Sequence, residues 1–362
     1  MLLDVPTTWD DSLLDSFAAL NEQYRAGGRI DEVYGSLPGD PIGSVKEAHL
    51  LPQAGMERLA QHVRRARSLG ISVAYVANSN ALTPEELSSR LPSIRELFSA
   101  LAKAGVAAVI LSDRRLFAPA SEAGLAIDVS AVAEVRGTAQ ARRFERMGVR
   151  RIKLSTALNR NFHLIGSLAK ALSCGVELLL NEDCLYQCHW RTEHFFIQGR
   201  RAAEGDGIKS LPNGVSMKDY PYSRCGPLMF DALSFPAELL KSRWIRPEDV
   251  RLYEDTGVTR FKLTGRTMSS GWIATVAERY LRRAHEGNVL DIMPLSQPLD
   301  DLARGFYLEN ASLEGFVESL QRRGSRCDEL CGDACVSCHV FARRLVESGD
   351  ARVRRSLQPP AD

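Results

Sequence analysis

Short apolar runs alternate with amphipathic stretches along most of the chain, as expected of strand–helix units that build a parallel sheet. Eight runs fit strands: residues 2–6, 30–36, 71–77, 106–112, 125–129, 151–155, 176–181 and 260–264. Residues 56–70 and 82–105 show helical periodicity, and the second stretch opens with Thr83, Pro84 and acids, which is typical of a helix N-terminus. We expect these stretches to form an outer layer of helices.

Eight strand–helix units predict an α/β fold, a (β/α)8 barrel of the TIM type. An open doubly wound sheet is the alternative, but no G-x-G-x-x-G motif follows the first strand. Polar residues follow several strands, where a barrel has its active site, although each is also a common turn former. They are Thr7, Thr8, Asn78, Asn80, Ser112, Asp113, Ser155, Asn181, Glu182, Asp183, Thr264 and Arg266.

The regular spacing is interrupted before the last strand. Residues 1–290 are therefore expected to form the barrel domain, with residues 182–259 as an insertion. Long insertions in barrels tend to be functional, and this one carries three cysteines and an aromatic, basic segment at residues 189–196. Residues 291–362 are expected to form a C-terminal helical extension that holds a cysteine-rich segment at residues 327–338.

Composition narrows the function classes. The chain has 362 residues, of which 44% are hydrophobic, enough for a full core. A net charge of +1, from 46 Lys and Arg against 45 Asp and Glu, disfavours a dedicated nucleic-acid binder. No apolar run approaches the roughly 20 residues that span a bilayer, and the N-terminus carries acids where a secretory signal has basic residues. We expect a cytoplasmic protein without a membrane span.

Eight cysteines in a chain of this size indicate metal binding rather than disulfides, because a reducing cytosol would not maintain disulfides. Cys184 and Cys188 stand four apart directly after a predicted strand, so one helical turn would direct both at one ion or cluster. A disulfide between them is the alternative. Cys225 is flanked by Arg and Gly, and such a loop can approach a cluster closely.

The tail spaces Cys327, Cys331, Cys335 and Cys338 as C-x3-C-x3-C-x2-C. Zinc and iron–sulfur clusters both use four thiolates, and the lack of two separated C-x2-C knuckles favours iron–sulfur, with zinc as the alternative. The last three cysteines also match the C-x3-C-x2-C spacing of radical S-adenosylmethionine enzymes. In those enzymes, however, the motif follows the first barrel strand, where this chain has no cysteine.

Residues beside the first cysteine pair suggest a substrate pocket. Arg191 or Arg266 is placed to bind a carboxylate, and His194 to move protons. The alternative is that the segment containing Arg191 and His194 is a surface helix next to a cluster.

The chain from residue 176 to 283 resembles the collagenase-like peptidase family classed as U-32. The resemblance rests on VELLLNEDCLYQC, RCGPLMF, the segment RWIRPEDVRLYEDTGVTRFKLTGR and the following WIATVAERYLRRA. FKLTGR matches the final-strand pattern of the family, in which Lys262 and Arg266 flank Gly265.

The resemblance implies an iron–sulfur protein on a barrel. Better-understood branches take part in oxygen-independent hydroxylation of quinone precursors, transfer RNA or ribosomal RNA, some with prephenate as the apparent oxygen donor. Four cysteines hold a 4Fe–4S cluster there, and Cys184, Cys188 and Cys225 match three of them. The fourth ligand would come from the tail, or the cluster would be open at one iron. The chain would hold one cluster, or two if the tail has its own.

The expected function is iron–sulfur-dependent redox modification, most plausibly hydroxylation, of a small metabolite, cofactor precursor or RNA. Arg191, His194, Lys262 and Arg266 would line the pocket. A partner subunit or electron donor is compatible with this function, and the neutral charge argues mildly against RNA. The alternatives are a noncatalytic metal-binding or electron-relay protein and a peptidase, although neither G-x-S-x-G nor H-E-x-x-H occurs.

Overall fold

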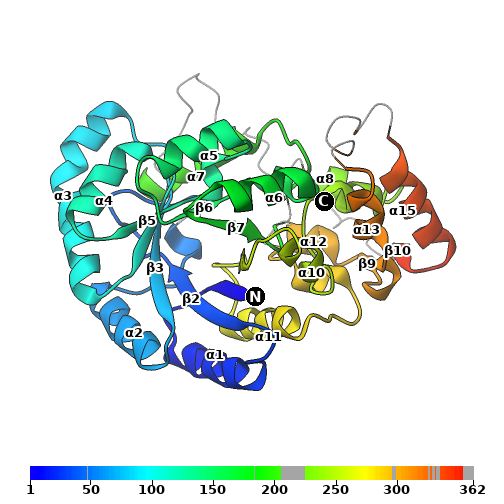
Figure 1. Ribbon diagram of the computed structural model, residues 1–362, viewed down its shortest axis with the longest axis horizontal. Helices are drawn as coiled ribbons and strands as arrows, with labels where there is room; N and C mark the ends of the chain where they lie inside the picture. The colour runs from blue at the N-terminus through cyan, green and yellow to red at the C-terminus, as the bar shows by residue number, and fades with distance from the viewer. Residues whose placement is uncertain are drawn as a thin grey trace, which may run out of the picture.

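The protein is a closed parallel barrel of eight strands surrounded by helices (Figure 1). The computed structural model describes residues 1–46, 48–182, 184–204, 225–295, 299–324, 327, 331 and 335–353. Strand β8 pairs with both β7 and β1, which closes the sheet and rules out the open doubly wound alternative. The barrel strands are β1 Leu2–Pro6, β2 Arg29–Gly35, β3 Ser72–Ala77, β4 Ala108–Leu111, β5 Ala126–Val129, β6 Arg151–Lys153, β7 Gly175–Leu179 and β8 Arg260–Lys262.

Side chains alternate between the two faces of the barrel wall, as a two-residue period requires. The outward-facing side chains Leu3, Val5 and Phe261 are fully buried in the core between strands and helices. The inner face is apolar from Tyr34 of β2 to β4, where Tyr34, Ala74, Val76, Ala108 and Ile110 pack together, whereas Glu32 of β2 belongs to the charged part of that face. On the remaining strands the inner face is dominated by charged residues, and this asymmetry positions the site described below.

Helices cover the outer face of the barrel. The first six are α1 Asp11–Gln23, α2 Met56–Ser68, α3 Pro84–Ala104, α4 Phe117–Glu122, α5 Thr138–Glu145 and α6 Phe162–Ala171, and α11 Ser270–Arg282 follows the last strand. The start predicted for α3 is confirmed, because the hydroxyl of Thr83 accepts from the N–H of Glu86 at 3.2 Å while the Glu86 carboxylate accepts from the N–H of Thr83 at 2.8 Å. This capping box satisfies two backbone donors of the first turn.

Between β7 and β8, where the sequence predicts an insertion, the described residues form four short or medium helices. They are α7 Arg191–Glu204, α8 Cys225–Met229, α9 Ala237–Lys241 and α10 Val250–Glu254. Cys225 is the first residue of α8, so the loop expected around this cysteine is a helix instead. The residues that join α7 to α8 lie outside the described part of the chain.

The C-terminal part packs beside the barrel (Figure 1). It contains α12 Leu299–Ala303, α13 Phe316–Gln321 and α15 Ser337–Glu347, and also an antiparallel pair formed by β9 Phe306–Leu308 and β10 Ala351–Val353. The extension predicted as helical therefore includes a small sheet. In its cysteine-rich segment, Cys327, Cys331 and residues 335–338 are described, and the intervening positions are not.

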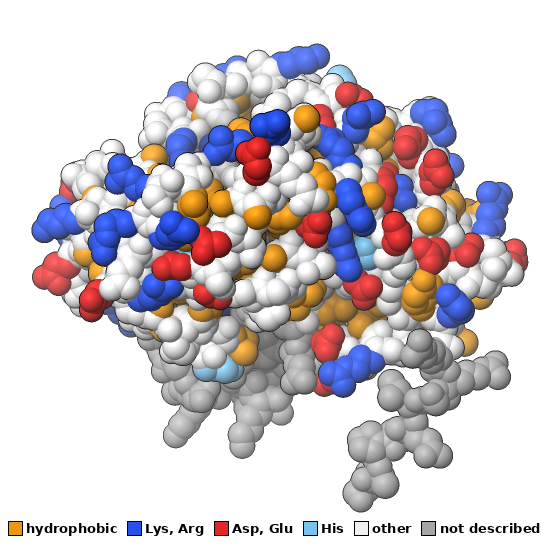
Figure 2. Space-filling view, turned by 90° about the horizontal axis from the view of Figure 1, so that it is seen from below, with side chains coloured by type: hydrophobic (Ala, Val, Ile, Leu, Met, Phe, Trp, Pro, Cys, Tyr) orange, Lys and Arg blue, Asp and Glu red, His pale blue; other side chains and the backbone are white. Residues whose placement is uncertain are grey.

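Two surface observations bear on partners. Among the described residues, no helix has both the length and the apolar character that a membrane crossing needs. Figure 2 shows Lys and Arg side chains interspersed with Asp and Glu over the face on the side of α1 and α11. That face offers no continuous basic surface for a phosphate backbone.

Candidate functional site

Arg266 lies past the carboxyl end of β8, at the end of the barrel where this fold places its active sites. Its guanidinium is 8% exposed and donates from Nη1 to the hydroxyl of Ser36, after β2, at 2.8 Å. Burial lowers the pKa of Arg266, and Tyr34, Tyr75 and Asp40 partly offset that effect. Within the described residues, no carboxylate lies at ion-pair distance from Arg266. The side chain is therefore a buried cation that an anionic substrate group can pair with.

Asp40 and Tyr75 form a hydrogen-bonded pair close to this cation. The Tyr75 hydroxyl donates to Oδ2 of Asp40 at 2.6 Å, and the N–H groups of Ile42 and Gly43 donate to Oδ1 at 2.9 and 2.7 Å. Burial raises the pKa of the Asp40 carboxyl, although these hydrogen bonds and Arg266 act in the opposite direction. A carboxyl group with a raised pKa beside a binding cation is suited to exchange protons with a substrate.

Lys262, the last residue of β8, points into the barrel. Its Nζ lies 3.0 Å from the centroid of the Tyr34 ring, and no hydrogen-bond acceptor in the described structure reaches it. Burial and the neighbouring Lys153 lower the pKa of Lys262 well below its ordinary value. A buried amine in this state is a base or nucleophile rather than a counter-ion.

A dense charge network fills the barrel beneath Lys262. Asp128 pairs with Lys153 at 3.0 Å, and Lys153 also pairs with Glu177 at 2.7 Å. The other pairs of the network are Arg150 with Asp128 and Glu32, Arg151 with Asp4, Glu32 and Asp128, and Arg260 with Asp4. Among the described residues, four buried carboxyl groups thus face four cations, and Lys262 takes no part in these ion pairs.

Arg191 attaches the cysteine-bearing loop to the barrel. It begins α7 and is 6% exposed, and it donates from Nε to Glu134 at 2.7 Å and from Nη2 to Glu182 at 2.9 Å. Burial opposes the charge on Arg191, but Glu182, Cys184 and Glu134 outweigh burial and raise its pKa. Because this guanidinium already pairs with two carboxylates, we interpret Arg191 as a residue that holds the cysteine-bearing loop against the barrel and not as one that binds substrate.

Cys184 and Cys188 follow β7 on a turn, not on the helical turn that their spacing suggests. Gln187 has a positive φ of 52°, and the helix begins only at Arg191. Between the two cysteines, the ring of Tyr186 lies 3.7 Å from the guanidinium carbon of the buried Arg243. His194 lies in the first turn of α7, where its N–H donates to the Trp190 carbonyl.

All eight cysteines belong to the described residues, are partly buried, and occur as thiols without a disulfide. This excludes the disulfide alternative for Cys184 and Cys188 in this structure. Cys174 is partly buried and packs against the core. The described side chains nowhere bring three or more Cys, His, Asp or Glu into ligating geometry. The donor chemistry of Cys184, Cys188 and Cys225 suits an iron–sulfur cluster, and their joint ligation stays a prediction.

A hydroxyl–imidazole–carboxylate relay, which the sequence did not reveal, lies outside the barrel wall. Thr7 follows β1 and its Oγ1 lies 2.8 Å from Nε2 of His62 on α2, while Nδ1 of His62 lies 2.9 Å from Oδ1 of Asp11 on α1. Thr7 is 1% exposed and His62 is fully buried. The relay has the connectivity of a nucleophile and base, but the helix layer seals it from substrate.

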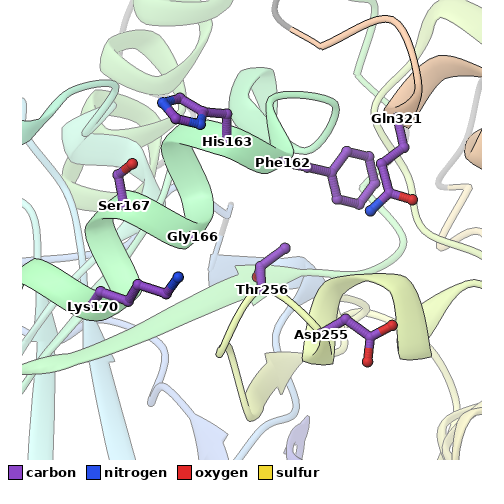
Figure 3. A pocket seen from close by; sticks show the side chains of 8 residues that line it. All are labelled: Phe162, His163, Gly166, Ser167, Lys170, Asp255, Thr256 and Gln321. Carbon is purple, nitrogen blue, oxygen red and sulfur yellow. The ribbon is translucent and has the colours of Figure 1, made fainter.

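A pocket of about 360 Å³ lies on the outer layer of the molecule (Figure 3). Its lining consists of Phe162, His163, Gly166, Ser167 and Lys170 of α6, Asp255 and Thr256 after α10, and Gln321 of α13. Figure 3 shows that the polar side chains among these residues lie well apart from one another. None of the candidate residues at the strand ends lines it, so it carries no part of the functional argument.

Sequence reasoning missed Asp40, Tyr75 and Glu134. The segment SLPGD at residues 36–40 follows the second strand, and its serine and aspartate fit the strand-end pattern that identified the other candidates. Tyr75 sits within a strand whose outward face looks like ordinary core, so its role becomes visible only through the hydrogen bond to Asp40.

Comparisons with known proteins connect this site to a family. Residues 30–206 match the family model of peptidase family U32. An uncharacterized protease of Methanocaldococcus jannaschii is 29% identical over 317 residues, which cover 87% of this chain and 89% of that protein. The chain is similar to peptidase family U32. The matched region begins well before the segment on which the sequence resemblance rests and includes Asp40, Tyr75, Glu134 and the first cysteine pair.

The chain also resembles solved structures. The U32 peptidase Mk0906 is 24% identical, covers 54% of this chain and 76% of its own, and superposes with a TM-score of 0.43. D-psicose 3-epimerase from Clostridium cellulolyticum H10 is 13% identical, with 50% and 73% coverage and a TM-score of 0.34.

Proposed function

We propose that the protein is an iron–sulfur-dependent enzyme that modifies a carboxylate-bearing substrate at the barrel mouth. The proposal depends on Arg266, which is buried near Asp40 and Tyr75 and forms no ion pair with a carboxylate of the described residues. Arg266 lies at the same end of the barrel as the loop that carries Cys184 and Cys188. The similarity to peptidase family U32 fits this function through the resemblance described above and does not by itself select the reaction.

The chain's own residues have defined tasks in this proposal. Arg266 binds the substrate carboxylate, and Asp40 exchanges a proton with the substrate. Lys262, whose pKa is lowered by burial, accepts a proton from the reacting end of the substrate. Cys184 and Cys188, with Cys225, would hold a 4Fe–4S cluster, which supplies one-electron chemistry when bound. Oxygen-independent hydroxylation is the reaction that the family resemblance implies.

Anaerobic purification tests the cluster. We expect a brown protein whose iron and sulfide are lost in the double variant Cys184→Ser and Cys188→Ser and kept in the control Cys174→Ser. A colourless wild-type protein with no iron and with stoichiometric zinc would eliminate the redox proposal.

Replacement of Arg266 by Ala tests the binding role. We expect the variant to keep the cluster spectrum and to lose thermal stabilisation by simple carboxylates such as benzoate, with benzamide as the uncharged control. Turnover should fall by at least about tenfold once a substrate is known, because a charge-assisted contact contributes more than 1 kcal/mol. Loss of the spectrum would instead assign Arg266 to the architecture of the cluster.

A peptidase is the second candidate, favoured by the Thr7–His62–Asp11 relay and by the name of the archaeal relative. The complete burial of His62 argues against this candidate. Hydrolysis of gelatin by the purified protein that disappears in Thr7→Val and persists in Arg266→Ala would establish it.

A further inference from the structure

Trp9 adopts a backbone conformation that is unfavourable for a residue with a Cβ atom. It lies between β1 and α1 with a φ of 62°, in the left-handed region, and it is 2% exposed. Such strain persists only where the surrounding structure fixes the residue, and it is often found near binding sites. The contacts of Trp9 therefore have to compensate for this strain.

The Thr7–His62–Asp11 relay fixes the backbone of Trp9. The N–H of Trp9 donates to Oγ1 of Thr7 at 3.2 Å, and its carbonyl accepts from Nε of Arg58 at 2.8 Å. Arg58 also pairs with Asp11 at 3.1 Å, and Asp11 lies 2.9 Å from Nδ1 of His62. This carboxylate favours the tautomer that has its proton on Nδ1, so Nε2 accepts from the hydroxyl of Thr7. The relay and Arg58 together thus hold both polar backbone groups of Trp9.

The indole ring of Trp9 carries this support to the end of β2. The ring packs edge to face against His62, with the centroids 5.5 Å apart and the planes at 81°. Gly35, the last residue of β2, leaves room for the ring, because a Cβ atom there would lie 2.6 Å from Cζ2 of Trp9. Nε1 of Trp9 donates to the carbonyl of Ser36 at 3.3 Å. Trp9 thus contacts two consecutive residues where β2 ends.

Ser36 links this support to Arg266. Its carbonyl accepts from Trp9, and its hydroxyl accepts from Nη1 of Arg266 at 2.8 Å. Among the described residues, Ser36 is the single hydrogen-bond partner of the Arg266 side chain. An arginine side chain has several rotatable bonds, so the place of its guanidinium depends on such contacts and on packing. The position of Ser36 therefore helps to fix where the charge of Arg266 lies.

We infer that Trp9, supported by the Thr7–His62–Asp11 relay, positions Arg266 through Ser36. The inference rests on the proposed function, in which Arg266 binds the substrate carboxylate. Trp9 and the relay are positioning residues, because the contacts described above lead to Arg266 through Ser36. The burial of His62 suits this role, because a rigid support needs no access to substrate.

Benzoate binding to the full chain tests whether Trp9 acts through Ser36. Trp9→Phe keeps an aromatic ring but removes the N–H that donates to Ser36, so benzoate affinity should fall about fivefold, as it does when one hydrogen bond is lost. Ser36→Ala should cause a similar fall. The combined variant should be no weaker than either single variant, whereas two independent effects would multiply to roughly 25-fold. Multiplied effects, or unchanged affinity in Trp9→Phe, would overturn the inference.

Trp244→Phe is the matched control for this measurement. Trp244 is also buried, and its Nε1 donates to a backbone carbonyl, that of Leu239, at 2.9 Å. Its replacement should leave benzoate affinity at the wild-type value. An equal fall in Trp244→Phe and Trp9→Phe would show a general effect of losing a buried indole, and the inference would be wrong.

Chemical modification of Arg266 by phenylglyoxal gives a second readout that needs no bound anion. Mass spectrometry of the Arg266 peptide should show modification about fivefold faster in Trp9→Phe and in Thr7→Val, which lacks the oxygen that accepts from Trp9. Thr7→Ser keeps that oxygen and should restore the slow wild-type rate. Equal rates in the wild type and Trp9→Phe would refute the inference. If the wild type does not prefer benzoate to benzamide, the proposed function fails, and the modification rates still show whether Trp9 holds Arg266.

Discussion

Two buried cations show how single residues reveal function in this molecule. Arg266 and Lys262 both lie at the end of β8, and neither has a carboxylate at ion-pair distance among the described residues. The two residues respond differently to the unfavourable desolvation of a buried charge, because a guanidinium stays charged whereas an amine can release its proton. The burial of Arg266 therefore favours pairing with an anion, and the burial of Lys262 lowers its pKa and favours the neutral amine.

Replacement of Lys262 by Met tests whether the amine is neutral. The folded pKa of Lys262 is lowered, so the unfolded chain binds the extra proton, and wild-type stability rises with pH up to the unfolded pKa near 10.4. Relative to the variant, the wild type should gain about 1.4 kcal/mol of unfolding free energy per pH unit across the window where only the unfolded lysine is charged. Urea unfolding at pH 7 and pH 9 measures the gain.

The exposed Lys103→Met provides the control for this measurement and should show no such gain. A constant difference between wild type and Lys262→Met at both pH values would mean that the buried amine stays protonated. Lys262 could then not serve as a base.

At the scale of elements, α7 and the loop before it depend on one side chain. Arg191 links this segment to Glu134 after β5 and to Glu182 after β7. Arg191→Met should lower the unfolding free energy by about 3 kcal/mol, because it removes the arginine partner of Glu182 and leaves Glu134 with only the half-exposed Arg136 as an ion-pair partner. It should also speed the alkylation of Cys184 and Cys188, followed by mass spectrometry.

Arg136→Met is the matched control, since Arg136 pairs with the same Glu134 from a half-exposed position. It should cost less than about 1 kcal/mol. If both variants behave alike, Arg191 does not fasten the loop.

The sequence predicted the positions of the strands well, but it did not predict the side-chain contacts between residues that are far apart in the chain. All eight strands were located within about two residues, because period-two burial and turn residues are local signals. The turn at Gln187 was missed because a left-handed residue depends on the packing of the whole loop. Glu134 and Asp40 were missed because their partners lie far away in the chain. The sequence around Arg191 likewise did not show which carboxylates pair with it.

At the scale of the whole molecule, the charge network inside the barrel links the strands that close it. Burial alone would raise the pKa of Asp128, but Lys153, Arg150 and Arg151 outweigh burial and hold it well below the ordinary value. Glu177 is lowered in the same way by Lys153 and Arg151. A depressed carboxyl pKa stabilises the fold above the unfolded value near 3.9 to 4.3, and this stabilisation is lost as pH falls toward the folded value.

Asp128→Asn should therefore destabilise the barrel most at neutral pH. It leaves Lys153 and Arg150 short of a buried partner, so the unfolding free energy at pH 7 should fall by about 3 to 5 kcal/mol. The gap to the wild type should narrow at pH 3, where the wild-type unfolded chain takes up the proton that folding must then expel. Asp15→Asn removes a half-exposed pair with Arg65 and should cost less than about 1 kcal/mol at both pH values. An equal gap at pH 7 and pH 3 would mean that folding does not shift the pKa of Asp128, and that the charge of this carboxylate does not stabilise the closed barrel.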